Sequence, residues 1–128
     1  MSEKKKVLIV TDGTESIHLI AQSIKDALEG CKVKICSAEN FTGTDLLPVG
    51  TFFLGCEKPA PASFAYLEDL LSHINLASRK CGVFSIKEKT LKYLSGLVKD
   101  CEADLADPLF ADGVKTPALK KWLKGIMR

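Results

Sequence analysis

Residues 4–30 read KKKVLIVTDGTESIHLIAQSIKDALEG, and this stretch decides the fold. Its four aliphatic residues 7–10 follow lysines and precede turn residues, which is the pattern of a strand buried on both faces. Apolar side chains then recur at helical spacing from Ile17 to Leu28, and Gly30 is a natural residue for a left-handed helix end. The stretch therefore predicts a buried strand, a tight turn and a helix.

The chain continues to alternate strand and helix patterns. Residues 32–36 (KVKIC) alternate polar and apolar side chains and predict an edge strand, whereas residues 37–50 carry at most a short helix. Residues 51–55 (TFFLG) and 81–86 (CGVFSI) predict two further strands. Apolar spacing predicts two more helices, over residues 64–74 and 91–101.

The last strand pattern, over residues 104–111, is weak because Pro108 removes a backbone donor, which fits an edge strand or a bulge. Thr116 and Pro117 then open a final helix as its cap and first-turn proline. Strands that alternate with helices at this spacing imply parallel strands joined by right-handed crossovers. We therefore predict one α/β domain over residues 1–128, a three-layer α/β/α sandwich around a five-stranded parallel sheet.

The composition narrows the class of protein. A chain of 128 residues that is 46% hydrophobic suits one buried core. Its 18 basic and 16 acidic residues are mostly scattered, which argues against a nucleic-acid interface. No apolar run reaches the roughly 20 residues of a membrane helix. The N-terminal hydrophobic stretch is too short for a secretory signal, so we expect a cytoplasmic protein.

The five cysteines form no CxxC pair, and their odd number and irregular spacing favour reduced thiols over a disulfide framework or a zinc site. Most of them lie in or beside apolar runs and are expected to be small core residues. Cys56, next to Lys58, opens the loop after the third strand, so an inert buried residue and a reactive thiol are both open interpretations. No catalytic triad, paired-carboxylate or metal-ligand spacing is present.

In a sheet of this kind the ligand crevice lies beyond the carboxyl ends of the strands. Three loops can reach it, at residues 11–16, 56–63 and 85–89. The first of these, TDGTES, has the chemistry for an anion. Gly13 allows close approach of the backbone, and the first amides of the following helix carry the positive end of its dipole.

The hydroxyl groups of TDGTES permit two interpretations. They belong to Thr11, Thr14 and Ser16. These hydroxyls could bind a phosphate monoester without a lysine, or they could cap the helix, which is the commoner use of such residues. Asp12 and Glu15 weigh against a dianion because uncompensated like charge opposes binding.

The chain resembles the flavodoxin-like family over nearly its whole length. The family's phosphate loop reads Thr or Ser, any residue, Thr, Gly, any residue, Thr or Ser; residues 11–16 keep both end hydroxyls and transpose the central pair. The segment TFFLGCEKPAPASFAYLEDLL is similar to the family's third strand, its proline-containing loop beside the flavin ring and the next helix. CGVFSI and ADLADPLFADG are similar to the strand before the second ring loop and to the last strand.

This resemblance implies the strand order 2-1-3-4-5 and FMN as the cofactor. It also implies a role in electron transfer or as a small reductase module, with a redox protein as the possible partner. The cofactor-binding residues that it implies are Thr11, Asp12, Gly13, Thr14, Glu15 and Ser16 in the first loop, Glu57, Lys58, Pro59 and Ala60 in the second, and Ser85, Ile86 and Lys87 in the third.

The two ring loops depart from the family because neither contains an aromatic residue to stack on a flavin. Phe64 and Tyr66 lie just beyond the second loop, where helical spacing favours core and surface packing. The alternative prediction is a flavodoxin-like domain without a cofactor that serves as a binding or regulatory module. If FMN binds, Lys58, Lys87 and Lys89 predict a higher reduction potential than in the family's acidic carriers.

Two other activities need residues that this chain lacks. A phosphoryl-accepting receiver domain needs an acidic cluster after the first strand, where only Asp12 stands, and an aspartate after the third, where Cys56 or Glu57 stands. A thiol-dependent phosphatase needs an arginine that closes an anion loop after Cys56, and none follows within reach. We expect neither activity.

Overall fold

A computed structural model describes residues 5–46, 48–111 and 116–127 of the chain. Its strands are β1 (Lys5–Thr11), β2 (Cys31–Ser37), β3 (Thr51–Gly55), β4 (Lys80–Ser85), β5 (Asp104–Leu105) and β6 (Leu109–Phe110). All strand pairs are parallel, and the order is β2-β1-β3-β4-β5, with β6 also paired to β4. The predicted parallel sheet and its order 2-1-3-4-5 are confirmed.

The fifth position of the sheet consists of two short strands. β5 pairs with the start of β4, at Lys80 and Cys81, and β6 pairs with its end, at Phe84 and Ser85. The chain between them contains Pro108, which has no amide hydrogen to donate to β4. The weak edge strand predicted for residues 104–111 is thus present in two pieces.

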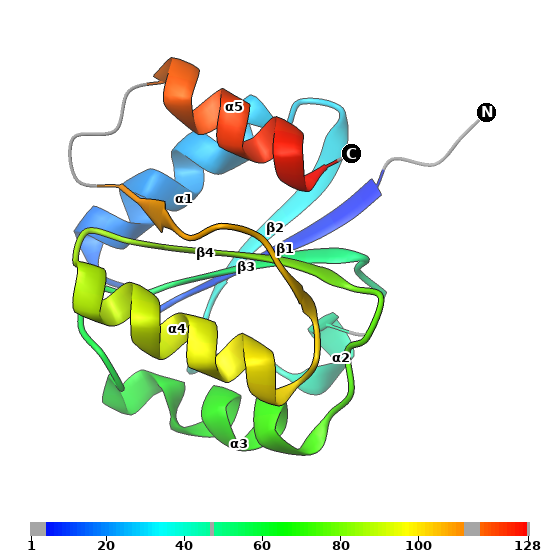
Figure 1. Ribbon diagram of the computed structural model, residues 1–128, viewed down its shortest axis with the longest axis vertical. Helices are drawn as coiled ribbons and strands as arrows, with labels where there is room; N and C mark the ends of the chain where they lie inside the picture. The colour runs from blue at the N-terminus through cyan, green and yellow to red at the C-terminus, as the bar shows by residue number, and fades with distance from the viewer. Residues whose placement is uncertain (1–4, 47, 112–115, 128) are drawn as a thin grey trace.

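The helices form two layers, one on each face of the sheet. Their bounds are α1 (Glu15–Ala27), α2 (Gly43–Leu46), α3 (Ala65–His73), α4 (Glu88–Asp100) and α5 (Thr116–Ile126), and a 3-10 turn, Ala62–Phe64, precedes α3. Figure 1 shows α1 and α5 above the sheet and α2, α3 and α4 below it. This arrangement confirms the three-layer sandwich.

Each face of the sheet has its own apolar core because successive strand side chains point to opposite faces. Phe53 packs with residues of α1 and α5, whereas its neighbour Phe52 packs with residues of α3 and α4. β1 divides in the same way, with Ile9 in the first core and Leu8 in the second. Both faces of the central strands are therefore buried, as the continuous aliphatic pattern predicts.

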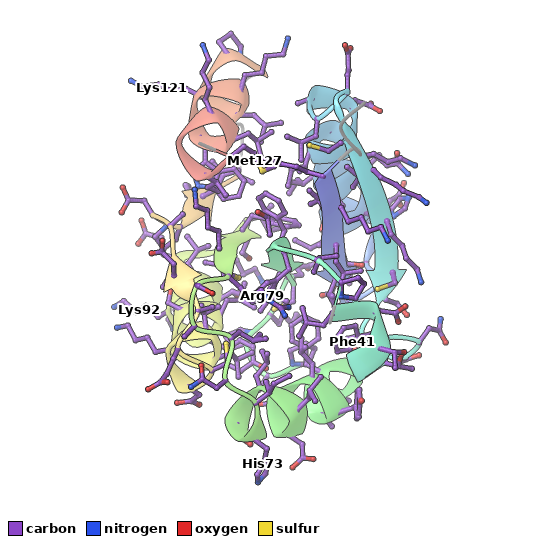
Figure 2. The ribbon with its side chains drawn as sticks, turned by 90° about the vertical axis from the view of Figure 1, so that its right-hand side faces the viewer. Phe41, His73, Arg79, Lys92, Lys121 and Met127 are labelled. Atoms are coloured by element: carbon purple, nitrogen blue, oxygen red, sulfur yellow. The ribbon has the colours of Figure 1, made fainter. Side chains whose placement is uncertain are left out.

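Polar side chains at the outside of these layers are well separated from the core. Lys92 and Lys121 extend away from α4 and α5 in Figure 2. Arg79 lies toward the middle of the same view, where its guanidinium donates hydrogen bonds of 3.1 Å to the carbonyls of Leu46 and Val49. Arg79 thus joins the start of β4 to the segment around α2.

Across the described residues, no helix has the length and apolar character to cross a membrane.

The predicted left-handed end at Gly30 is wrong. The amide of Leu28 instead closes α1 on the carbonyls of Ile24 and Lys25, and Gly30 has an ordinary negative φ. Among the glycines that the structure describes, the left-handed one is Gly13, with φ of +82°, in the turn between β1 and α1. A left-handed residue is not needed at the end of α1, because the Leu28 amide already bonds to two carbonyls of the last turn.

Candidate functional site at the carboxyl edge of the sheet

The carboxyl ends of the three central strands lie at one edge of the molecule, on the left-hand side of Figure 1. Thr11 at the end of β1 pairs with Gly55 at the end of β3, and Gly55 pairs with Phe84 near the end of β4. This register starts the three predicted loops side by side. Helices α1, α3 and α4 all begin at the same edge.

The first loop is a turn of three residues, 12–14, between β1 and α1. The Asp12 carboxylate organises it. Asp12 Oδ1 accepts hydrogen bonds from the amide of Thr14 at 3.1 Å and from its hydroxyl at 2.7 Å. Thr11 Oγ1 accepts a longer bond, of 3.3 Å, from the amide of Gly13. The Thr14 hydroxyl therefore donates to a carboxylate.

The start of α1 has no side-chain cap. Thr14 occupies the N-cap position, but its side chain makes no capping bond. The first backbone bond of the helix runs from the amide of His18 to the carbonyl of Thr14 at 2.9 Å. Within the described residues, no hydrogen bond takes the amides of Glu15, Ser16 and Ile17. The hydroxyl cap that the sequence suggested is wrong at Thr14, and three donors remain at the positive end of α1.

Glu57, in the loop after β3, holds the first and second loops together. Its amide donates to Asp12 Oδ2 at 2.8 Å, and its own Oε2 accepts a bond from the Ser16 hydroxyl at 3.2 Å. Its carbonyl accepts a bond of 2.9 Å from Thr90 Oγ1 at the start of α4. Each loop thus supplies a carboxylate that binds a donor of the other. We call this pair of contacts, Asp12 with Glu57 N and Glu57 with Ser16, the carboxylate clamp.

A cavity of about 420 Å³ lies between the two clamped loops. Its lining consists of Asp12, Thr14, Glu57, Lys58, Pro59, Ala60, Pro61 and Ser63. Six of these were predicted, whereas Pro61 and Ser63 were missed although they lie in the same loop. A second hollow, of about 640 Å³, lies between the end of α1 and α5 and contains none of the predicted residues.

The other predicted residues do not line this cavity. Thr11 is buried, Gly13 forms the turn, Glu15 is exposed, and Ser16 acts through Glu57. Ser85 is fully buried, its hydroxyl donates to the carbonyl of Cys56 at 2.7 Å, and it accepts a bond of 3.3 Å from the amide of Lys87. Ile86 is half-buried and Lys87 exposed. The third loop therefore supports the second instead of lining the cavity.

Thr90 supports the second loop of the candidate site and was not predicted from the sequence. It is fully buried on α4, beside the core residue Leu91, and its hydroxyl fixes the carbonyl of Glu57. A threonine on the apolar face of a helix was the available signal, because a buried hydroxyl needs a hydrogen-bond partner.

The nearest aromatic side chains point into the core or onto another helix. Phe64 is fully buried, with its ring 6.4 Å from that of Tyr93. Tyr66 packs on Phe41, with ring centroids 6.0 Å apart, and its hydroxyl accepts a bond from the amide of Gly43. Neither Phe64 nor Tyr66 lines the cavity, as their helical spacing predicts.

The Cys56 thiol is buried behind the site. Its burial, reinforced by the negative charge of Asp12, raises the pKa of the thiol to about 12. Thiolate is the nucleophilic form, so this environment suppresses reactivity at neutral pH. Of the two interpretations of Cys56, the structure favours the inert residue. Cys81 and Cys101 are also buried, as expected for core cysteines, whereas Cys31 and Cys36 are half-buried.

The cavity has two carboxylates in its wall, and the positive start of α1 lies next to it, after the lining residue Thr14. The unpaired amides of α1 attract an anion, and the carboxylates of Asp12 and Glu57 oppose one. Lys58 is an exposed cation in the lining, and Pro59, Ala60 and Pro61 form the apolar part of the wall. Ala60 has φ of +48°, which turns this wall sharply.

Comparisons with known proteins identify relatives by structure alone. No family model matches the chain, and no curated protein matches it in sequence. A flavodoxin from Streptococcus pneumoniae TIGR4 superposes with a TM-score of 0.81 at 14% identity, over 95% of this chain and 97% of that one. A short-chain flavodoxin associated with a PDU bacterial microcompartment has a TM-score of 0.84 at 14% identity, over 98% and 97%.

A third similar structure contains a ligand. The flavodoxin of Fusobacterium nucleatum bound to flavin mononucleotide has a TM-score of 0.71 at 13% identity, over 96% of this chain and 97% of that one. Because these identities are low, the likeness establishes the architecture and leaves the chemistry to the residues described above.

Proposed function

The chain has a flavodoxin-like fold, and we propose that it binds FMN at the carboxyl edge of its sheet and acts in electron transfer or as a small reductase module. The observation that carries the proposal is the row of three unpaired amides, on Glu15, Ser16 and Ile17, beside the 420 Å³ cavity. The FMN-bound flavodoxin among the structural relatives supports the proposal at the level of the fold.

The proposed site has a phosphate end, at the start of α1 next to the cavity, and a ring end in the cavity wall. At the phosphate end, the amides of Glu15, Ser16 and Ile17 are the donors that would bind a phosphate, with Gly13 allowing close approach. At the ring end, Pro59, Ala60 and Pro61 would pack against a flavin and exclude water from one of its faces. FMN, when bound, supplies reversible one- and two-electron chemistry.

The chain's own hydrogen bonds would keep this site in place. Thr90 holds the carbonyl of Glu57, and Ser85 holds the carbonyl of Cys56, so two successive peptide groups of the second loop are fixed from α4 and β4. Fixed backbone groups orient a ligand at little entropic cost. The proposed donor or acceptor of electrons is a redox protein, and the proposed compartment is the cytoplasm.

Titration of the purified protein with FMN and with riboflavin, followed by flavin fluorescence, tests the proposal. The two ligands differ by the phosphate, so FMN should bind more tightly if the amides of α1 hold it. Gly13→Asp should abolish FMN binding because a side chain and a charge would block the phosphate. Gly30→Asp, where an added Cβ also meets open space but the backbone is not left-handed, controls for the added charge and should leave binding unchanged.

The outcomes of this titration separate the two functions. An FMN affinity that Gly13→Asp leaves unchanged would show that the phosphate lies elsewhere. Absence of binding by either flavin would favour the second candidate, a cofactor-free binding or regulatory module. The specific observation for that candidate is the carboxylate clamp, because it satisfies loop donors without any ligand.

A further inference from the structure

The Asp12 carboxylate is an anion that the protein itself supplies to the first loop. Both of its oxygens are engaged: Oδ1 accepts two bonds from Thr14, and Oδ2 accepts one from the amide of Glu57. The side chain is half-buried and lines the cavity next to the start of α1. Its negative charge is therefore fixed in the wall of the cavity.

We propose that Asp12 is a specificity-determining residue that reduces the preference of this site for phosphorylated flavins over unphosphorylated ones; this inference rests on the proposed flavin binding. A phosphate monoester brings more than one negative charge toward the unpaired amides of Glu15, Ser16 and Ile17. The fixed carboxylate opposes that charge through Coulomb repulsion, which is strong because the wall is partly shielded from water. Riboflavin ends in an uncharged ribityl hydroxyl, so the Asp12 carboxylate does not repel it.

The two other carboxylates of the site are less suited to this role. Glu15 is exposed at the first turn of α1, where solvent and salt screen its charge. Glu57 accepts one side-chain bond, at 3.2 Å, from Ser16. Asp12 alone of the three accepts bonds on both oxygens, from two different loops. The chain thereby folds its first loop around its own carboxylate, so the loop needs no phosphate to be ordered.

The test compares Asp12→Asn with Glu15→Gln, two substitutions that each remove one negative charge. Dissociation constants for FMN and riboflavin are measured by flavin fluorescence for the wild type and both variants. Asp12→Asn should raise the ratio of FMN to riboflavin affinity by about tenfold, since it removes the fixed charge, and Glu15→Gln should change the ratio less than about twofold. An unchanged or lowered ratio in Asp12→Asn would overturn the inference.

Asp12→Ser provides a second variant, because its hydroxyl can still accept a bond from the Thr14 amide if the asparagine variant folds poorly. A titration with inorganic phosphate, followed by the backbone amide signals of residues 15–17, gives a readout without flavin. These signals should move at lower phosphate concentration in the Asp12 variants than in the wild type or in Glu15→Gln. Equal titration in all the proteins would also overturn the inference.

This design distinguishes the inference from the proposed function. If the wild type binds FMN but the Asp12 variants keep the same ligand preference, the proposed function survives and the role of Asp12 fails. If neither flavin binds any of the proteins while phosphate moves the amide signals only in the Asp12 variants, the proposed flavin binding is rejected. The repulsion of phosphate by Asp12 is then still supported.

Discussion

The hydroxyl of Ser85 donates a hydrogen bond of 2.7 Å to the carbonyl of Cys56, and this contact joins the ends of β4 and β3 beneath the candidate site. Both residues are fully buried. The position of the second loop therefore depends on a side chain that itself makes no contact with the cavity.

Ser85→Ala should lower the free energy of unfolding by about 1–3 kcal/mol, because it leaves the buried carbonyl of Cys56 without its partner. Urea denaturation measures the change. Ser23→Ala is the control, since Ser23 is exposed and its hydroxyl donates to the carbonyl of Leu19 in its own helix. Equal stability of Ser85→Ala and the wild type would contradict the importance of this contact.

Gly55→Ala should destabilise the fold by about 1–3 kcal/mol through overpacking. A Cβ atom at Gly55 would overlap the ring of Phe84 on the neighbouring strand β4. This ring is fully buried in the core that faces α1 and α5, so it has little room to move. Gly96→Ala provides the opposite control on α4, where the new methyl group meets open space. That substitution should stabilise the protein by about 0.5–1 kcal/mol, and thermal unfolding of both variants checks the contrast.

Cys56 should be modified slowly by an aromatic disulfide reagent at pH 8. Burial raises the pKa of its thiol to about 12 and that of Cys36 to about 11, so each remains protonated at this pH. Cys31 is half-buried at the start of β2 and should supply the rapid phase of the reaction. Cys31→Ser should remove that phase and Cys56→Ser should preserve it; the reverse pattern would mean that Cys56 is a reactive thiol.

Lys58 should raise the reduction potential of bound FMN. It lies exposed in the lining of the cavity, and a positive charge there favours the more negative, reduced flavin. Lys58→Glu should lower the potential by an amount on the order of tens of millivolts, measured by redox titration of the reconstituted protein. Lys121→Glu, on α5, should have little effect. A strongly depressed potential for the last reduction step in the wild type would refute the prediction.

The elements that the sequence predicts best are those whose pattern depends only on local periodicity. Val7, Ile9 and their neighbours alternate between two buried faces, so their aliphatic run identified β1 without knowledge of its partners. Gly30 was misassigned because the end of α1 depends on which carbonyls the Leu28 amide reaches, and that is a property of the folded turn.

The candidate site was predicted in location but less well in its chemistry. The position of the loops follows from strand order, so Asp12, Glu57 and Pro59 were named in advance. The contact between Asp12 and the amide of Glu57 spans 45 positions and depends on the register that pairs Thr11 with Gly55. No local pattern encodes such a contact. The sequence alone therefore treated Asp12 as an uncompensated charge.

The division of the outer strand into β5 and β6 also affects how the molecule behaves at high concentration. An exposed sheet edge can recruit a strand from another copy and start aggregation. Here each segment at that edge is two residues long, and Pro108 interrupts the row of donors between them. The opposite edge, β2, carries the exposed Lys32, and charged lysines on an edge strand disfavour pairing with a second copy. Both borders of the sheet thus carry features that oppose the addition of a strand from another copy.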